Sequence, residues 1–143
     1  MSGVLFNANT GEVTTGTSAK TIIQIVAASN HRVFIKCVDV SFKGIVVTDA
    51  PIYVRVLRQT TAGTMSALTP TKGNNADDET LQTTAQHTAT AEPTAGDVLK
   101  SREIHPQMSG RFGPFWMPGG TKLGVEVTAG VSTSCVVSVE GEE

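Results

Sequence analysis

Val33-Phe-Ile-Lys-Cys-Val-Asp-Val-Ser-Phe42 alternates apolar and polar residues and changes phase once. Val33 and Ile35 share one parity, whereas Val38 begins a run of the other parity. Both sets can face one core only if the strand contains an extra residue near Lys36-Cys37, which a β-bulge supplies. Such bends are common where a strand turns the corner of a sandwich or barrel. The stretch therefore predicts a long, bulged β-strand.

The same alternation recurs on both sides of this stretch and indicates an all-β chain of about eight strands, since no segment has a helical period. Turn residues separate the runs, as in Pro118-Gly119-Gly120. The further strands are expected at residues 21–27, 52–57, 98–104, 112–117, 123–128 and 135–140, with additional edge strands at 11–17 and 83–91.

Residues 59–97 form a long, weakly charged segment in mid-chain, which we interpret as a loop. Long crossovers between two sheets favour a Greek-key jelly roll over an up-and-down barrel, whose hairpins are short. We therefore expect an antiparallel β-sandwich with jelly-roll topology. It would form a single domain over residues 19–140, preceded by an N-terminal arm over residues 1–18.

The composition argues against several classes of partner. The 143 residues carry a net charge of −2, and only 17% of them are charged, against about a quarter in typical proteins. This balance gives no general attraction to nucleic acid or to an anionic membrane surface. The N-terminus lacks the features of a signal peptide, and no apolar run approaches the ~20 residues of a membrane helix.

Motifs of enzyme chemistry are missing from the sequence. There is no phosphate-binding GxxxxGK[ST], no GxGxxG after a strand and no GxSxG. His31, His87 and His105 lie in three different segments, whereas a metal-binding cupin places two histidines one residue apart on one strand. We therefore expect solvated turn or edge histidines, no metal, no cofactor, no small-molecule substrate and no enzymatic activity. A degenerate cupin-like enzyme is the disfavoured alternative.

Two cysteines, Cys37 and Cys135, lie in separate apolar strands. No CxxC spacing supports a zinc site. We expect two buried free thiols, and a disulfide between them stays open at this point.

Two short apolar stretches are candidates for an interface. The segment from Arg111 to Gly120 contains the only Trp and two of the five Phe residues. Its rings either plug the end of the sandwich or anchor a subunit interface, where Trp, Phe, Met and Arg are favoured. Val4-Leu5-Phe6, ahead of a polar run, has the pattern of an apolar hook on a flexible arm.

Several segments carry a family resemblance. They are Leu57-Arg-Gln-Thr-Thr-Ala-Gly-Thr64, Ser66-Ala-Leu-Thr-Pro70, Ala85-Gln-His-Thr-Ala-Thr-Ala-Glu-Pro-Thr94, His105-Pro106 and the approach from Pro118 to Val125. Together they resemble small structural proteins of tailed bacteriophages, of the capsid cement or head decoration type. The resemblance implies a β-sandwich or jelly-roll domain that sits as an oligomer on the outside of an HK97-fold shell. Such proteins bridge neighbouring capsomers, which stabilises the shell.

This resemblance implies a virion protein made in the cytoplasm of the host bacterium. Its expected partners are the major capsid protein and other copies of itself, as a dimer or trimer. The residues expected at its contacts are Val4, Leu5, Phe6, Met65, Leu68, Phe115 and Trp116. One alternative is a β-domain associated with a phage tail or fibre. Another is a carbohydrate-binding, adhesive β-sandwich in which Trp116 and Tyr53 stack on sugar rings.

Overall fold

The computed structural model describes residues 3–43, 50–74, 76 and 78–143, and all regular structure in this part of the chain is β-strand. The all-β prediction is therefore confirmed. The strands outnumber the expected eight because Leu5–Asn9, Thr64–Leu68 and Thr71–Lys72 form additional strands and the strand expected at residues 112–117 is divided into two. They are β1 (Leu5–Asn9), β2 (Val13–Thr14), β3 (Lys20–Val26), β4 (Val33–Phe42), β5 (Ile52–Gln59), β6 (Thr64–Leu68), β7 (Thr71–Lys72), β8 (Thr84–Ala91), β9 (Ala95–Ile104), β10 (Ser109–Phe112), β11 (Phe115–Met117), β12 (Lys122–Thr128) and β13 (Ser134–Glu142).

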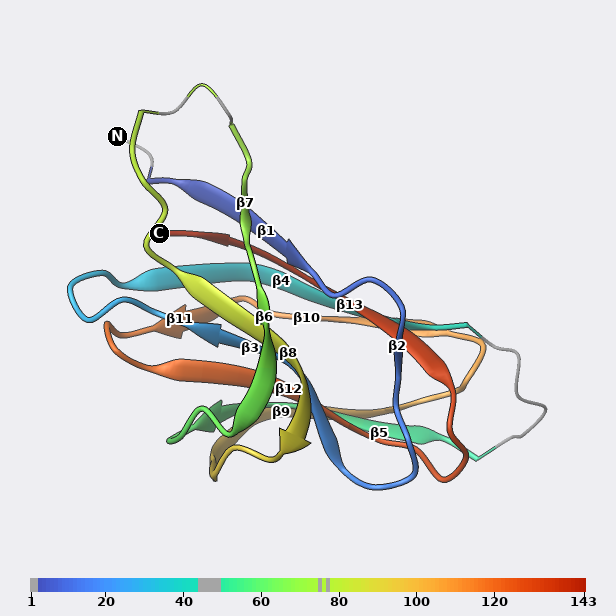
Figure 1. Ribbon diagram of the computed structural model, residues 1–143. Helices are drawn as coiled ribbons and strands as arrows, with labels where there is room; N and C mark the ends of the chain where they lie inside the picture. Colours follow the sequence, from blue (N-terminus) through green and yellow to red (C-terminus); the bar gives the residue numbers. More distant parts are fainter. Residues whose placement is uncertain (1–2, 44–49, 75, 77) are drawn as a thin grey trace.

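The strands form two antiparallel sheets (Figure 1). The first sheet has the order β10-β4-β13-β1-β7, with β11 also paired to β4 and β2 to β13. The second sheet has the order β6-β8-β3-β12-β5-β9. The chain crosses repeatedly from one sheet to the other. β3 and β5 belong to the second sheet, whereas β4, which connects them in the sequence, belongs to the first. Likewise β12 belongs to the second sheet, whereas β11 and β13 belong to the first.

One hydrophobic core collects inward-facing residues from both sheets. The first sheet contributes residues that include Phe6, Val38, Val40 and Val137, and the second contributes residues that include Ile25, Val54, Val56 and Val125. Because alternate residues of a strand point to opposite faces, each sheet also keeps an outer face directed away from this core. The arrangement agrees with the predicted β-sandwich.

The predicted bulge lies in β4. The consecutive residues Glu140 and Gly141 of β13 pair with Cys37 and Ile35, so Lys36 is the extra residue. The apolar residues on both sides of it are buried, namely Val33, Ile35, Val38 and Val40.

The strand expected at residues 112–117 is interrupted beside this bulge. Phe112 ends β10 and Phe115 begins β11, and Gly113 lies between them with a φ of +129°. A Cβ at Gly113 would lie 2.8 Å from the carbonyl oxygen of Lys36, so only glycine fits against the bulged backbone. The edge of the first sheet is therefore divided into two short strands.

Residues 4–9 correct the prediction of an N-terminal arm. β1 pairs with β13 from Leu5 opposite Glu142 to Asn9 opposite Ser138. Val4 and Phe6 are buried, because alternate residues of the strand face inward. The apolar character that suggested a hook is that of a core-facing strand. Residues 1–2 of the predicted arm lie outside the described residues.

Residues 59–97 are also not one long loop. They contain β6, β7 and β8 and the start of β9. The strand predicted at residues 83–91 is present as Thr84–Ala91, but it lies between β6 and β3 rather than at an edge. The strand predicted at residues 11–17 is reduced to Val13–Thr14.

The Phe6→Ala substitution tests the place of β1 in the fold. The Phe6 ring is fully buried, and a Cβ at Gly141 would lie 2.7 Å from its Cζ atom, so the ring fills the space above that glycine. We expect the free energy of unfolding in urea to fall by about 3–5 kcal/mol. Asn7→Ala, at an exposed position of the same strand, should change it by less than about 0.5 kcal/mol. Equal, small effects of both substitutions would contradict a structural role for β1.

Candidate interaction surface

Trp116 is the exposed member of the aromatic segment. In β11 the side chains alternate, so that Met117 is buried and Phe115 is half-buried against the core, whereas Trp116 is 58% exposed. Trp116 pairs with Phe34 of β4, and both side chains lie on the outer face of the first sheet. Of the two roles considered for these rings, packing in the sandwich therefore applies to Phe115, and exposure for a contact applies to Trp116.

Two neighbours hold the indole ring. The ring centroids of Phe34 and Trp116 are 4.4 Å apart, with the planes tilted by 36°. The guanidinium carbon of Arg32 lies 5.0 Å from the centroid of the Trp116 ring, within the range of a cation–π contact. At an exposed site this contact contributes about 0.5–1 kcal/mol. The three residues, which we call the Trp116 cluster, present a large aromatic surface in a defined orientation.

An open hollow of about 320 Å³ lies beside the Trp116 cluster, with Gly3, Glu142 and Glu143 completing its wall. Its rim is held by hydrogen bonds. The backbone N–H of Gly3 donates to Glu142 Oε1 at 2.7 Å, and the hydroxyl of Thr83 donates to Glu143 Oε1 at 2.7 Å. The hollow therefore combines an aromatic wall, one cation and two carboxylates.

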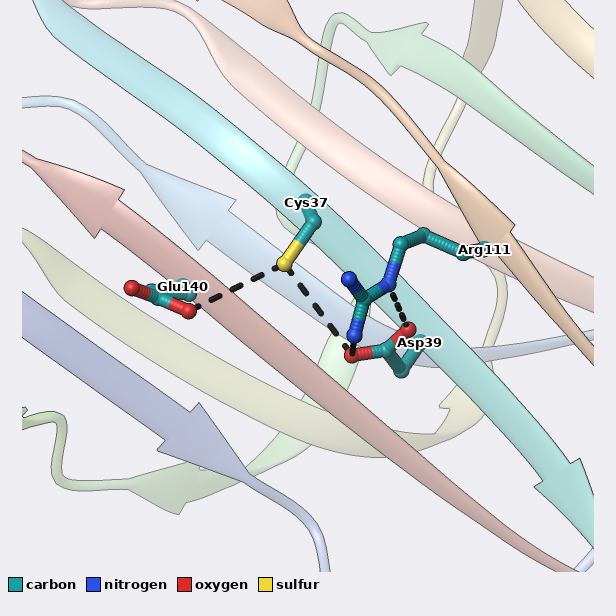
Figure 2. A network of polar contacts seen from close by, with 4 residues as sticks. All are labelled: Cys37, Asp39, Arg111 and Glu140. Atoms are coloured by element: carbon teal, nitrogen blue, oxygen red, sulfur yellow. Dashed lines mark hydrogen bonds and ion pairs between the residues drawn. The ribbon is translucent and has the colours of Figure 1, made fainter.

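A second polar group lies on the same outer face (Figure 2). Arg111 of β10 is directly opposite Asp39 of β4, and its Nε and Nη2 atoms lie 2.7 and 3.2 Å from the two carboxylate oxygens. The sulfur of Cys37 lies 4.0 Å from Asp39 Oδ2 and 3.9 Å from Glu140 Oε2. The ion pair links the edge strand β10 to β4.

Cys37 does not have the environment of a nucleophilic thiolate. Partial burial, followed by the negative charge of Asp39, raises the pKa of the Cys37 thiol above its ordinary value of 9.0. The thiolate is the reactive form of cysteine, and here the neighbouring carboxylates disfavour it. Near neutral pH, Cys37 is a neutral thiol that donates a weak hydrogen bond to Glu140.

Both cysteines are free thiols. Cys135 is buried in the core, while Cys37 is only partly buried on the outer face of the sheet, so the expectation of burial holds for Cys135 alone. Cys135 pairs with Phe42 and Cys37 pairs with Glu140 in the same β4–β13 ladder. The two side chains point to opposite faces at distant positions of the ladder, which does not permit a disulfide.

The remaining residues expected at contacts are spread over the molecule. Leu5 is half-buried in β1. Met65 and Leu68 are half-buried in β6, at the edge of the second sheet, and Leu68 packs against the core. The structure therefore places Met65 and Leu68 on one strand and Phe115 and Trp116 on another, and these two pairs belong to different sheets.

Two segments of the family resemblance, residues 57–64 and 85–94, lie side by side. The Thr60 N–H donates to the carbonyl of Thr94 at 2.9 Å, and the Thr94 N–H donates to Thr61 Oγ1 at 2.8 Å. The N–H of Thr21 in β3 donates to Glu92 Oε1 at 2.7 Å. Residues 60–63 and 92–94 therefore cover part of the outer face of the second sheet.

Buried polar side chains lie beneath this cover. Gln24 is fully buried, and its Nε2 donates to Gln59 Oε1 at 2.7 Å and to the carbonyl of Thr61 at 3.1 Å. Gln59 Nε2 donates to Thr21 Oγ1 at 2.9 Å, and Gln86 Nε2 donates to Gln24 Oε1 at 3.1 Å. A buried network whose members are hydrogen-bonded to one another specifies one arrangement of the chain. Its role is to fix the cover on the sheet.

Arg32, Phe34 and the glutamine network were not predicted from the sequence. Arg32 and Phe34 share one parity in a run whose other parity is apolar, and this signal could have placed them on one outer face. Gln24 is the one polar residue in the apolar run from Ile22 to Val26. A glutamine in such a strand indicates a buried, paired amide.

The three histidines lie apart, as their spacing suggested. His31 Nε2 lies 3.0 Å from Gln82 Nε2, His87 Nδ1 lies 2.9 Å from Thr88 Oγ1, and His105 Nδ1 accepts from the N–H of Gln107 at 3.2 Å. Among the described residues, no group of three or more His, Cys, Asp and Glu side chains is arranged to hold a metal ion. No helix long and apolar enough to cross a membrane occurs in the same residues.

Comparison of this chain with known proteins finds no matching family model, no matching curated protein and no matching solved structure. The interpretation of its surface therefore depends on the geometry described above.

Gly124→Ala tests the glutamine network. Gly124 pairs with Gln24 of β3 and Leu57 of β5, and a Cβ there would collide with the side-chain amide of Gln59. Displacing this amide breaks its bonds to Gln24 and Thr21, so we expect a loss of about 1–3 kcal/mol in the free energy of unfolding. Gly130→Ala is the control, because a Cβ there meets no atom within 4 Å. An unchanged stability of Gly124→Ala would contradict the proposed role of the network.

Because the thiol of Cys135 is buried, we predict that the protein loses stability at alkaline pH. Burial raises the pKa of Cys135 from 9.0 to about 12. The unfolded chain loses this proton first, so the contribution of Cys135 is complete below pH 9.0 and decreases as the pH rises toward about 12. The free energy of unfolding of the wild type should therefore fall more steeply over this range than that of Cys135→Ala. Parallel pH profiles would show that the thiol is not shielded from water.

Proposed function

We propose that this chain is a non-enzymatic structural protein of a tailed-bacteriophage virion, of the capsid cement or decoration type. It would bind the outer face of an HK97-fold head and bridge neighbouring major capsid subunits. In this proposal it is made in the host cytoplasm and acts on the capsid surface. The segments at residues 57–64 and 85–94, which carry the family resemblance, support it because they pack together as one unit.

The observation that carries the proposal is the Trp116 cluster. Trp and Arg are the residues that most often dominate the binding energy of protein interfaces. Trp116 is 58% exposed although Phe34 and Arg32 hold its ring in place, so little conformational entropy is lost on binding. A large, ordered aromatic side chain in contact with water favours a protein-binding surface over a catalytic one.

The fold supports a jelly-roll arrangement within the same proposal. The repeated change of sheet along β3, β4 and β5, and again along β11, β12 and β13, is typical of Greek-key crossovers. A rigid block of this kind suits a protein that stabilises a shell by binding only its assembled form. Each bound copy shifts the equilibrium toward the assembled lattice by mass action.

Carbohydrate binding through Trp116 and Tyr53 is less well supported. Tyr53 is 38% exposed and alternates with the core residues Ile52 and Val54, so it lies on the outer face of the second sheet. Trp116 lies on the outer face of the first sheet. The two rings therefore point away from each other and do not form one stacking platform.

Binding of recombinant protein to mature phage heads, measured by cosedimentation, tests the proposal. We expect Trp116→Ala to weaken binding about 30-fold or more, as for an interface residue worth about 2 kcal/mol. Tyr53→Ala, an exposed aromatic on the other sheet, should bind as the wild type does. Cryo-electron microscopy of the decorated heads should place density between capsomers. Density confined to the tail, or no binding by the wild type, would refute the cement proposal and favour the tail or adhesive alternative.

A further inference from the structure

β6 is the end strand of the second sheet and pairs only with β8 in the described part of the chain (Figure 1). Its sequence, Thr64-Met-Ser-Ala-Leu68, contains no charge and no proline. Thr64, Ser66 and Ala67 are exposed. The backbone groups that point away from β8 therefore form an open, uncharged edge, which is a template for pairing with another strand.

The opposite edge of the same sheet has the features that prevent such pairing. β9 carries Asp97, Lys100, Arg102 and Glu103 within ten residues, and its ladder with β5 contains two register shifts. Lys100 and Arg102 pair with the core residues Val56 and Val54, so they occupy inward-facing positions. Charges directed inward and irregular registers are common ways in which proteins protect an exposed edge. β6 carries no charge, although its ladder with β8 contains one register shift, between Thr64 and Ser66.

The edges of the first sheet are short. β7 has two residues and includes Lys72, β11 has three residues, and β10 has four residues and includes Arg111. β6 is longer than any of these strands and is uncharged. It is therefore the edge most open to strand addition.

The core also reaches the surface beside β6. An open hollow of about 350 Å³ is lined there by residues that include Leu68, Pro70, Leu81 and Ala85. Leu68 and Leu81 are only partly buried, although both pack against the core. Leu68 pairs with Ala85 of β8, so the hollow lies at the Leu68 end of the β6–β8 pair and leaves apolar side chains accessible near the open edge.

We propose that β6 pairs antiparallel with β6 of a second copy of this chain, about a twofold axis at Ser66. This register sets Ser66 opposite its own copy, and Thr64 opposite Leu68 of the partner subunit. A second copy fits because the edge is self-complementary under a twofold axis, as in most homodimers. It also brings no charge to an edge that has none, whereas the β9 edge carries four charged residues.

The dimer requires no capsid, so it goes beyond the proposed function and can be tested separately. A twofold axis between antiparallel strands of one sheet is perpendicular to that sheet. Both first sheets therefore lie on the same side of the joined second sheets, and both Trp116 clusters face the same direction. The dimer would therefore present two Trp116 clusters on one side. That these clusters bind a capsid together rests on the proposed function.

Sedimentation velocity over a wide range of protein concentration tests the dimer. The wild type should reach twice the monomer mass, and Ser66→Lys should lose the dimer because two like charges meet on the axis. Ser109→Lys, an exposed serine on the β10 edge, is the matched control and should dimerise as the wild type does. Because no ion pair contributes, the wild-type equilibrium should change little with salt.

A charge-reversal pair separates a loss of pairing from a loss of fold. Ser66→Lys and Ser66→Glu should each be monomeric, and an equal mixture should recover the dimer, since the register places lysine opposite glutamate. A wild type that stays monomeric at the highest concentration would overturn the proposal. So would a dimer that persists in Ser66→Lys, or a mixture of the two variants that remains monomeric.

Discussion

The extra residue in β4 is the constraint on which both outer-face clusters depend. Lys36 shifts the alternation of the strand, so that even-numbered positions face outward before it and odd-numbered positions after it. Phe34 is therefore outward before the bulge, and Cys37 and Asp39 are outward after it. The same bulge meets Gly113 and divides the adjacent edge into β10 and β11. β11 carries Trp116 opposite Phe34, and β10 carries Arg111 opposite Asp39.

The two outer faces of the sandwich differ in how they are used. Part of the second sheet is closed by residues 60–63 and 92–94, and the amides of Gln24 and Gln59 fix this cover from below. The outer face of the first sheet has Trp116 exposed, beside a hollow. Polar side chains are thus buried on the outer face of the second sheet, whereas the Trp116 ring is exposed on the outer face of the first. In the proposed function, the capsid would therefore contact the outer face of the first sheet.

Alternation of apolar and polar residues was sufficient to predict the main strands and the bulge. It failed for β6, where Thr, Ser and Ala differ too little in hydrophobicity to show a period, and for β7, which has only two residues. It also misassigned Phe6, since a five-residue strand gives few alternations, and only its pairing with β13 distinguishes it from an arm. Trp116 was identified from composition. Its contacts with Arg32 and Phe34 cross between strands distant in the sequence, and single-sequence patterns carry no information on such pairs.

The two proposed contacts complement each other physically. Strand pairing at β6 would use backbone hydrogen bonds, which depend little on the identity of side chains. The Trp116 cluster would supply the specific contact, with its cation and neighbouring carboxylates setting the orientation. Two such clusters on one side of the proposed dimer would bind a repeating lattice with an effective concentration fixed by their spacing. Modest affinity at each cluster would then be enough for bridging, provided that both clusters bind at once. Both can bind only if the lattice repeat matches the distance between the clusters.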